Sequence, residues 1–162
     1  ETLLTLPIPT AAAVVGKFLA ALAFAAIALA LTFPFVVTVN ELGSPDNGVI
    51  AAGYIASLLV AACFLAVGGA MSALTRNQVI AFVLGAAVCF LFTLFGSPIV
   101  TEAFGGKLPP ELLAGMRRVA LIERFNSIVR GVFSLRDLVF FLSFTGFWLF
   151  VTVQAVELKK AA

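Results

Sequence analysis

Residues 48–74 read GVIAAGYIASLLVAACFLAVGGAMSAL, a run without a single charged side chain. A helix needs about 20 mostly apolar residues to cross roughly 30 Å of hydrocarbon. Three further runs meet this criterion without a charge, at residues 18–39, 79–100 and 138–156. A soluble helical bundle would need polar outward faces, which these runs lack. The sequence therefore predicts an all-α polytopic membrane protein with four transmembrane helices.

The composition also excludes several kinds of ligand-binding and catalytic site. The chain has no histidine, so it offers no imidazole ligand for a metal or haem. It has no phosphate-binding loop of the Walker type, and its apolar runs lack the acidic and basic residues that relay protons in coupled transporters. We expect a non-catalytic protein without cofactor, metal or nucleic-acid partner. If the protein moves a substrate against its gradient, the energy must come from a partner protein. Cys63 and Cys89 lie in the middle of predicted spans, where we expect them to pack as small apolar residues.

The first 17 residues open with an apolar stretch that Pro7 and Pro9 interrupt. It is too short to span, so it would lie at the membrane interface or against a partner. The chain begins with Glu1 rather than Met, which favours the C-terminal part of a longer protein. Pro34 should kink the first span, because proline removes a backbone donor. Small residues of the second span, among them Gly68 and Gly69, should allow close helix packing.

Five of the six arginines lie between residues 101 and 136. On helical wheels this segment resolves into two amphipathic pieces of about three turns, too short to cross the bilayer. Their apolar faces contain, respectively, Leu112, Leu113, Met116, Val119 and Ala120, and Phe125, Ile128, Val129, Val132 and Phe133. Ser134 and Asp137 have the spacing of a capping box that opens the last span. We therefore expect two interfacial or re-entrant helices before residue 137.

Two counts of the cations give opposite orientations. Four spans place both ends of the chain on one side of the membrane, with Lys17, Arg76, Lys159 and Lys160 there and six cations on the other. The raw count puts the termini outside. The first hairpin puts them inside, because its outer loop carries only Glu41 and Asp46. We favour termini inside, since the arginines of residues 101–136 are interleaved with acids on amphipathic faces.

Three blocks of sequence resemble the type 2 ATP-binding-cassette (ABC) exporter permeases, in the branch that includes gliding-motility-associated permeases. The first is Glu1-Thr2-Leu3-Leu4-Thr5-Leu6-Pro7 followed by Gly16-Lys17-Phe18, and the second runs from residue 68 to 82 through Ser72-Ala73-Leu74-Thr75-Arg76-Asn77-Gln78. The third comprises Glu123-Arg124-Phe125, Arg130-Gly131 and Arg136-Asp137-Leu138. Two positions depart from the family pattern: Arg124 replaces a frequent His, and Phe140-Phe141 replaces a pair with an aromatic hydroxyl.

The resemblance implies six family spans, of which this chain would hold the last four. It implies residues 1–17 as a cytoplasmic coupling segment, three spans within 18–100, an extracytoplasmic helical element at 101–136, and the last span with a cytoplasmic tail at 137–162. It further implies a permease dimer, homo- or heteromeric, in the cytoplasmic membrane of a bacterium, bound to ABC ATPase subunits. The function expected is ATP-driven export, and the alternative is a non-transporting anchor or assembly subunit. The sequence does not distinguish lipid, polysaccharide, peptide and drug substrates.

Two groups of residues are candidates for functional contacts. Coupling to the ATPase would involve Glu1, Leu3, Leu4, Leu6, Arg76 and Asn77. The leucines could instead rest on the membrane interface, and the last two residues could form a polar turn with a positive-inside anchor. The re-entrant candidates are Glu123, Arg124, Arg130, Arg136 and Asp137. These residues could line an exit, or they could form a structural ion-pair network, because charges at membrane depth require partners.

Overall fold

All regular elements are α-helices in the computed structural model, which describes residues 9–95, 97–131 and 134–161. They are Thr10–Ala30 (α2), Phe33–Leu42 (α3), Asn47–Leu74 (α4), Gln78–Phe95 (α5), Pro98–Phe104 (α6), Pro110–Val119 (α7), Leu121–Val129 (α8) and Leu135–Ala161 (α9). Four units are long and apolar enough to cross a membrane: α2 together with α3, α4, α5 and α9. The predicted all-α fold with four candidate spans is confirmed.

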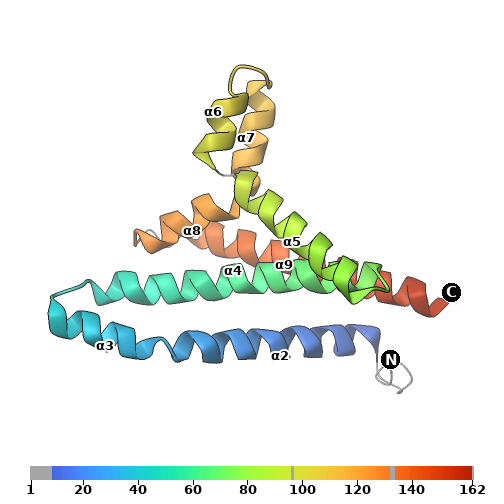
Figure 1. The fold of residues 1–162 in the computed structure, drawn as a ribbon, viewed down its shortest axis with the longest axis horizontal. Helices are drawn as coiled ribbons and strands as arrows, with labels where there is room; N and C mark the ends of the chain where they lie inside the picture. The colour runs from blue at the N-terminus through green and yellow to red at the C-terminus, as the bar shows by residue number, and fades with distance from the viewer. Residues whose placement is uncertain (1–8, 96, 132–133, 162) are drawn as a thin grey trace.

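Helix α4 is the central element of the bundle. It packs against α2, α5, α8 and α9, and Figure 1 shows it running alongside α2 with α9 crossing behind it. At the contact with α5, a Cβ added to Gly85 would lie only 3.8 Å from the Cα of Gly68. Two glycines therefore bring the two backbones close together, as predicted for the small residues of this span.

The first span is interrupted where the sequence predicted a kink. Helix α2 ends at Ala30, and α3 begins at Phe33 with Pro34 in its first turn. The amides of Leu31 and Thr32 donate to the carbonyls of Ile27 and Leu29, which closes the last turn of α2. The break follows from the missing donor of Pro34, which the first turn of a new helix tolerates.

The third span is shorter than predicted. Helix α5 ends at Phe95 instead of continuing to Val100. A separate helix, α6, begins at Pro98 with Ser97 as its N-cap. The hydroxyl of Ser97 accepts a hydrogen bond from the amide of Ile99 at 3.3 Å. Pro98 disfavours a helical conformation at the residue before it and fits the first turn of a new helix. The segment before α9 therefore contains three short helices, where the wheels predicted two.

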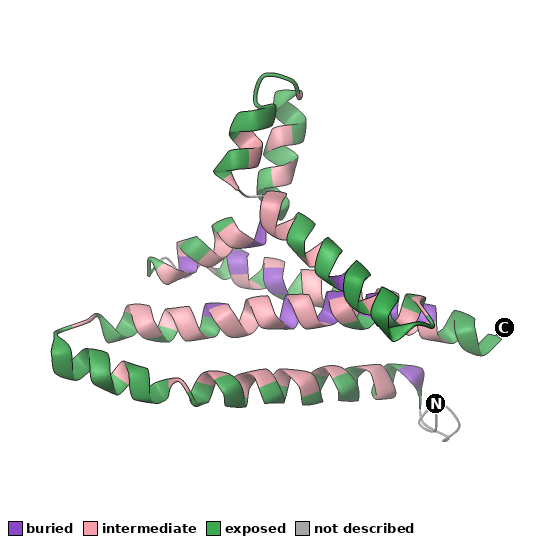
Figure 2. Cartoon of the chain, in the orientation of Figure 1, coloured by how far each residue is buried: buried purple, intermediate pink, exposed green. Residues whose placement is uncertain are grey.

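The two predicted amphipathic pieces differ in their packing. Leu121 and Ile128 of α8 are fully buried, in one cluster with Ala56 and Cys63 of α4 and Phe141 of α9. Helix α7 has no buried residue. With α6 it projects from the body of the bundle, mostly green in Figure 2. Thus α8 is an integral part of the core, whereas α7 is covered only in part, with Leu113 and Met116 half-buried and Leu112 and Val119 exposed.

Candidate functional site

The beginning of α2, the end of α4 and the end of α9 meet at one end of the bundle. Lys159 donates to the backbone carbonyl of Thr75 at 3.0 Å, and Lys160 donates to the hydroxyl of Thr10 at 3.0 Å. The beginning of α2 and the end of α9 lie on the same side in Figure 1. We call this region, with Lys17, Arg76, Lys159 and Lys160, the basic end. All four cations are exposed.

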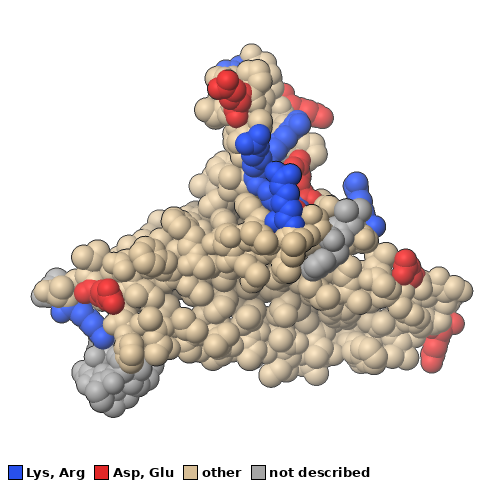
Figure 3. All heavy atoms as spheres, turned by 180° about the vertical axis from the view of Figure 1, so that it is seen from behind, with Lys and Arg blue, Asp and Glu red and all other residues tan. Residues whose placement is uncertain are grey.

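The opposite end of the same helices carries carboxylates. Glu41 and Asp46 flank the turn between α3 and α4, and the Asp46 carboxylate accepts from the amide of Gly48 at 2.9 Å. Figure 3 shows charged side chains at both ends of the long body and around the projecting α6–α7 pair, with an uncharged surface between them. The charge of α2, α3 and α4 is therefore segregated along the bundle.

Of the predicted coupling residues, Arg76 and Asn77 lie at the basic end. The side-chain oxygen of Asn77 accepts from the amide of Val79 at 2.9 Å and so caps α5. Arg76 is exposed beside it. The other coupling candidates, Glu1, Leu3, Leu4 and Leu6, lie outside the described residues.

Within the segment predicted to be re-entrant, Arg124 of α8 makes three contacts at once. One terminal nitrogen donates to the Asp137 carboxylate at 2.8 Å, and the other donates to the carbonyl of Arg118 at 2.9 Å. The guanidinium carbon lies 3.9 Å from the ring centroid of Phe140. Together these atoms form what we call the Arg124 contact, which joins the end of α7, the middle of α8 and the first turn of α9.

The Arg124 contact is largely enclosed. The side chain of Arg124 is 15% exposed and that of Asp137 is 12% exposed. Within the described residues, the Arg124 Nε is buried without an acceptor. A charge in such surroundings requires a partner, because an isolated buried ion is strongly unfavourable. The ion pair with Asp137 and the contact with the Phe140 ring therefore offset the cost of burying the Arg124 charge.

The Arg124 contact lies at the edge of the apolar part of α9. No charged residue separates Asp137 from Glu157 along this helix, a distance of about 30 Å at 1.5 Å per residue. That length matches the hydrocarbon thickness of a bilayer. Glu157 lies near the basic end, so Asp137 and its partner Arg124 lie about one hydrocarbon thickness from that end along α9.

The structure brings together only part of the predicted re-entrant set. Arg124 and Asp137 form the one ion pair found within the described ranges, whereas Glu123, Arg130 and Arg136 are exposed. The capping box forms in part: the Ser134 hydroxyl accepts from the amide of Arg136 at 3.3 Å. Asp137, its expected acidic member, instead accepts from Arg124 of another helix.

An aromatic row on α9 was not singled out from the sequence. Phe140, Phe144 and Trp148 follow one another at intervals of four, with ring centroids 6.1 and 6.2 Å apart. Phe92 of α5 approaches Phe144 edge-on at 5.1 Å. The row begins under the Arg124 guanidinium and continues to the α5–α9 contact. The four-residue spacing is the signal that could have revealed it.

Comparison with known families shows the family to which the chain belongs. The family described as ABC-2 family transporter protein matches residues 1–158, nearly the whole chain. The chain belongs to the ABC-2 transporter family. No match was found among curated proteins, and none among solved structures.

Membership in the ABC-2 family makes the chain an ABC transporter permease, a membrane component of a transport system. In this family the permease is generally non-catalytic and works with an ABC ATPase. This division of labour agrees with the lack of a Walker-type loop in the sequence. The family also accounts for the four candidate spans and the apolar surface between the charged ends.

Proposed function

We propose that this ABC-2 protein is a permease subunit of an ATP-driven exporter in the cytoplasmic membrane of a bacterium. The observation that carries the proposal is the family match over residues 1–158 of a chain with four candidate spans. A separate ATPase subunit would hydrolyse ATP, and two permease subunits, identical or different, would form the translocation path. The resemblance to the gliding-motility branch supports export as the direction of transport.

The basic end would face the cytoplasm. Positive charge is enriched on the cytoplasmic side of membrane proteins, and Lys17, Arg76, Lys159 and Lys160 gather at one end while Glu41 and Asp46 lie at the other. Residues 101–136 would then belong to an extracytoplasmic element. The position of the Arg124 contact, about one hydrocarbon thickness from Glu157, supports this assignment.

The ATPase would act on the permease through the segment that precedes α2. Leu3, Leu4 and Leu6 are the apolar residues of this segment that would dock, and Arg76 is a cation at the basic end, where α2 begins. Helix α2 packs against both α4 and α9. The hydrogen bond between Lys160 and Thr10 ties its first residue to the end of α9. A displacement of the docked segment would therefore be transmitted through α2 to α4 and α9.

The docking step can be tested by changing Leu3 and Leu4 to Asp in the full permease and co-purifying it with its ATPase subunit. Two carboxylates in an apolar interface would be desolvated without partners, so the expected result is loss of the ATPase from the complex. Leu112→Asp serves as the control, because Leu112 is 53% exposed on α7. Intact assembly with the double variant would overturn docking through residues 1–17.

Transport itself is tested by reconstituting the permease with its ATPase in liposomes. A permease predicts ATP hydrolysis above the rate of the isolated ATPase and ATP-dependent movement of a substrate across the membrane. A non-transporting anchor would bind the partner without either effect. Unstimulated ATPase in an intact, reconstituted complex would therefore contradict the proposed function while leaving the family identity untouched.

A further inference from the structure

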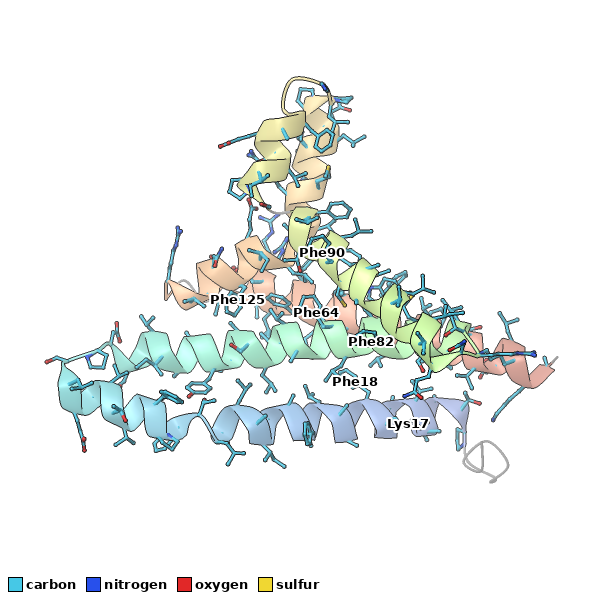
Figure 4. The ribbon with its side chains drawn as sticks, viewed as in Figure 1. Lys17, Phe18, Phe64, Phe82, Phe90 and Phe125 are labelled. Atoms are coloured by element: carbon cyan, nitrogen blue, oxygen red, sulfur yellow. The ribbon has the colours of Figure 1, made fainter. Side chains whose placement is uncertain are left out.

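A groove with a volume of about 510 Å³ opens between α2, α4 and α9 close to the basic end. Its α2 wall includes Phe18 and Ala21, and its α9 wall includes Leu149 and Val156. The size is that of a pocket for a small molecule. Figure 4 shows Lys17 and Phe18 on the part of α2 that runs alongside α4.

Small residues form the part of the α4 wall that lies nearest the basic end. Gly68, Gly69 and Ala73 line the groove there, and a Cβ added to either glycine would meet nothing within 4 Å. Helix α2 therefore runs beside α4 without filling the space between them. From Phe64 to Ala73 the wall extends over about 14 Å at 1.5 Å per residue, which is about half the thickness of the hydrocarbon.

The α2 wall of the groove carries a cation. Lys17 is the one charged residue among the described residues that line the groove, and it is exposed. Thr10, about two helical turns before Lys17, also lines the groove, and its hydroxyl accepts from Lys160, which brings a second ammonium group to the end of the groove where α2 begins. No carboxylate lines the groove within the described ranges. The charge thus favours an anion between Lys17 and the start of α2, against walls that are largely apolar.

The groove is accessible from the bilayer. No residue of the most apolar part of the α2–α3 span is buried, and α2 leaves its outer surface free along its length. A molecule from the lipid phase can therefore reach the groove along α2. Basic pockets between transmembrane helices on the cytoplasmic side are characteristic binding places for anionic lipid head groups.

We propose that this groove binds one anionic phospholipid, with its phosphate at Lys17 and one acyl chain between α2 and α4. The acyl chain fits the apolar walls, and the phosphate neutralises the Lys17 ammonium group. The proposal rests on the proposed orientation of the basic end toward the cytoplasm and on the α2–α4–α9 arrangement, but not on transport.

The test is native mass spectrometry of the full purified permease in detergent, titrated with phosphatidylglycerol and, separately, with phosphatidylcholine of the same acyl chains. We expect phosphatidylglycerol to bind more tightly. Lys17→Gln should lower the affinity for phosphatidylglycerol about fivefold, since a cation near the membrane surface contributes about one kcal/mol to binding. The affinity for phosphatidylcholine should not change. Lys107→Gln, on the α6–α7 connection, should change neither. Glycerol 3-phosphate should fail to displace the lipid, because it lacks the acyl chain.

The acyl-chain part is tested by filling the groove. Gly69→Phe should abolish tight phosphatidylglycerol binding, and Ala21→Phe provides the same test from the α2 wall. Gly53→Phe is the matched control: Gly53 is also on α4 with nothing within 4 Å of an added Cβ, and it lies outside the groove. Equal binding of both lipids, or undiminished binding by a folded groove-filling variant, would overturn the proposal. Loss of oligomers with lipid binding unchanged would assign the groove to a protein partner instead, and would also overturn it.

Discussion

Lys159 and Arg124 each stand at one boundary of the apolar part of the bundle, but their surroundings differ. Lys159 is exposed and reaches back to a single carbonyl, that of Thr75. Arg124 is 15% exposed and contacts a carboxylate, a carbonyl and an aromatic ring. Cations at the basic end keep their water and can serve orientation or docking. The enclosed Arg124 guanidinium contacts protein groups of α7 and α9 instead of bulk water, so it holds α7, α8 and α9 in one arrangement.

The largest expected effect comes from removing the enclosed cation. Arg124→Met leaves the Asp137 carboxylate without its ion pair, and breaking a buried pair from one side costs about 3 kcal/mol. We expect a decrease of that size in the free energy of unfolding, measured by SDS titration in mixed micelles. Arg118→Met is the control, because Arg118 is exposed and contributes only its backbone carbonyl to the contact.

The double variant Arg124→Met with Asp137→Leu sharpens this comparison. It removes both charges, and neutral replacements of buried pairs are often tolerated. We expect it to be more stable than Arg124→Met alone, which a double-mutant cycle would measure. A double variant as unstable as the sum of the two single variants would show that the ion pair does not couple α8 to α9.

A smaller effect is expected from the aromatic partner. Phe140→Leu keeps an apolar side chain but removes the ring under the guanidinium, and such a cation–π contact is worth about 1 kcal/mol. The decrease in unfolding free energy should be smaller by about that amount in the Arg124→Met background, where the ring has no cation to contact but its packing against Phe144 is still lost. Phe147→Leu, at a 60% exposed position of the same helix, should have little effect in either background.

The smallest effect is expected at the basic end. Lys159→Met removes one exposed hydrogen bond, and exposed charged contacts contribute about 0–1 kcal/mol. The unfolding free energy should therefore change by less than about 1 kcal/mol in the same SDS titration. A loss as large as that of Arg124→Met would abolish the distinction between exposed and enclosed cations.

The parts of the fold that depend on local sequence were predictable. Four charge-free runs predicted the spans, and Pro34 predicted the interruption between α2 and α3. The small residues around Gly68 predicted a close helix contact, which the structure places between α4 and α5. The early end of α5 at Phe95 was missed, because the apolar composition continues past Ser97 and Pro98. Hydropathy does not register where a helix is broken by a serine cap and a proline.

The Arg124 contact could not be predicted from a helical wheel. A wheel describes one helix, whereas Asp137 and Phe140 belong to α9 and meet Arg124 only after α8 packs against the bundle. The two positions noted as departures from the family pattern, Arg124 and Phe140, are in contact with each other. The pair is physically coherent, since arginine places a permanent cation over an aromatic face.

The orientation of the two regions is the central claim of this account, and site-directed labelling tests it most directly. In a background with Cys63 and Cys89 replaced by Ala, single cysteines are introduced as Asn126→Cys on α8 and Asn77→Cys at the basic end, both exposed positions. Intact cells are treated with a membrane-impermeant maleimide before and after lysis. We predict that Asn126→Cys is labelled on intact cells and Asn77→Cys only after lysis. The reverse pattern would contradict this orientation.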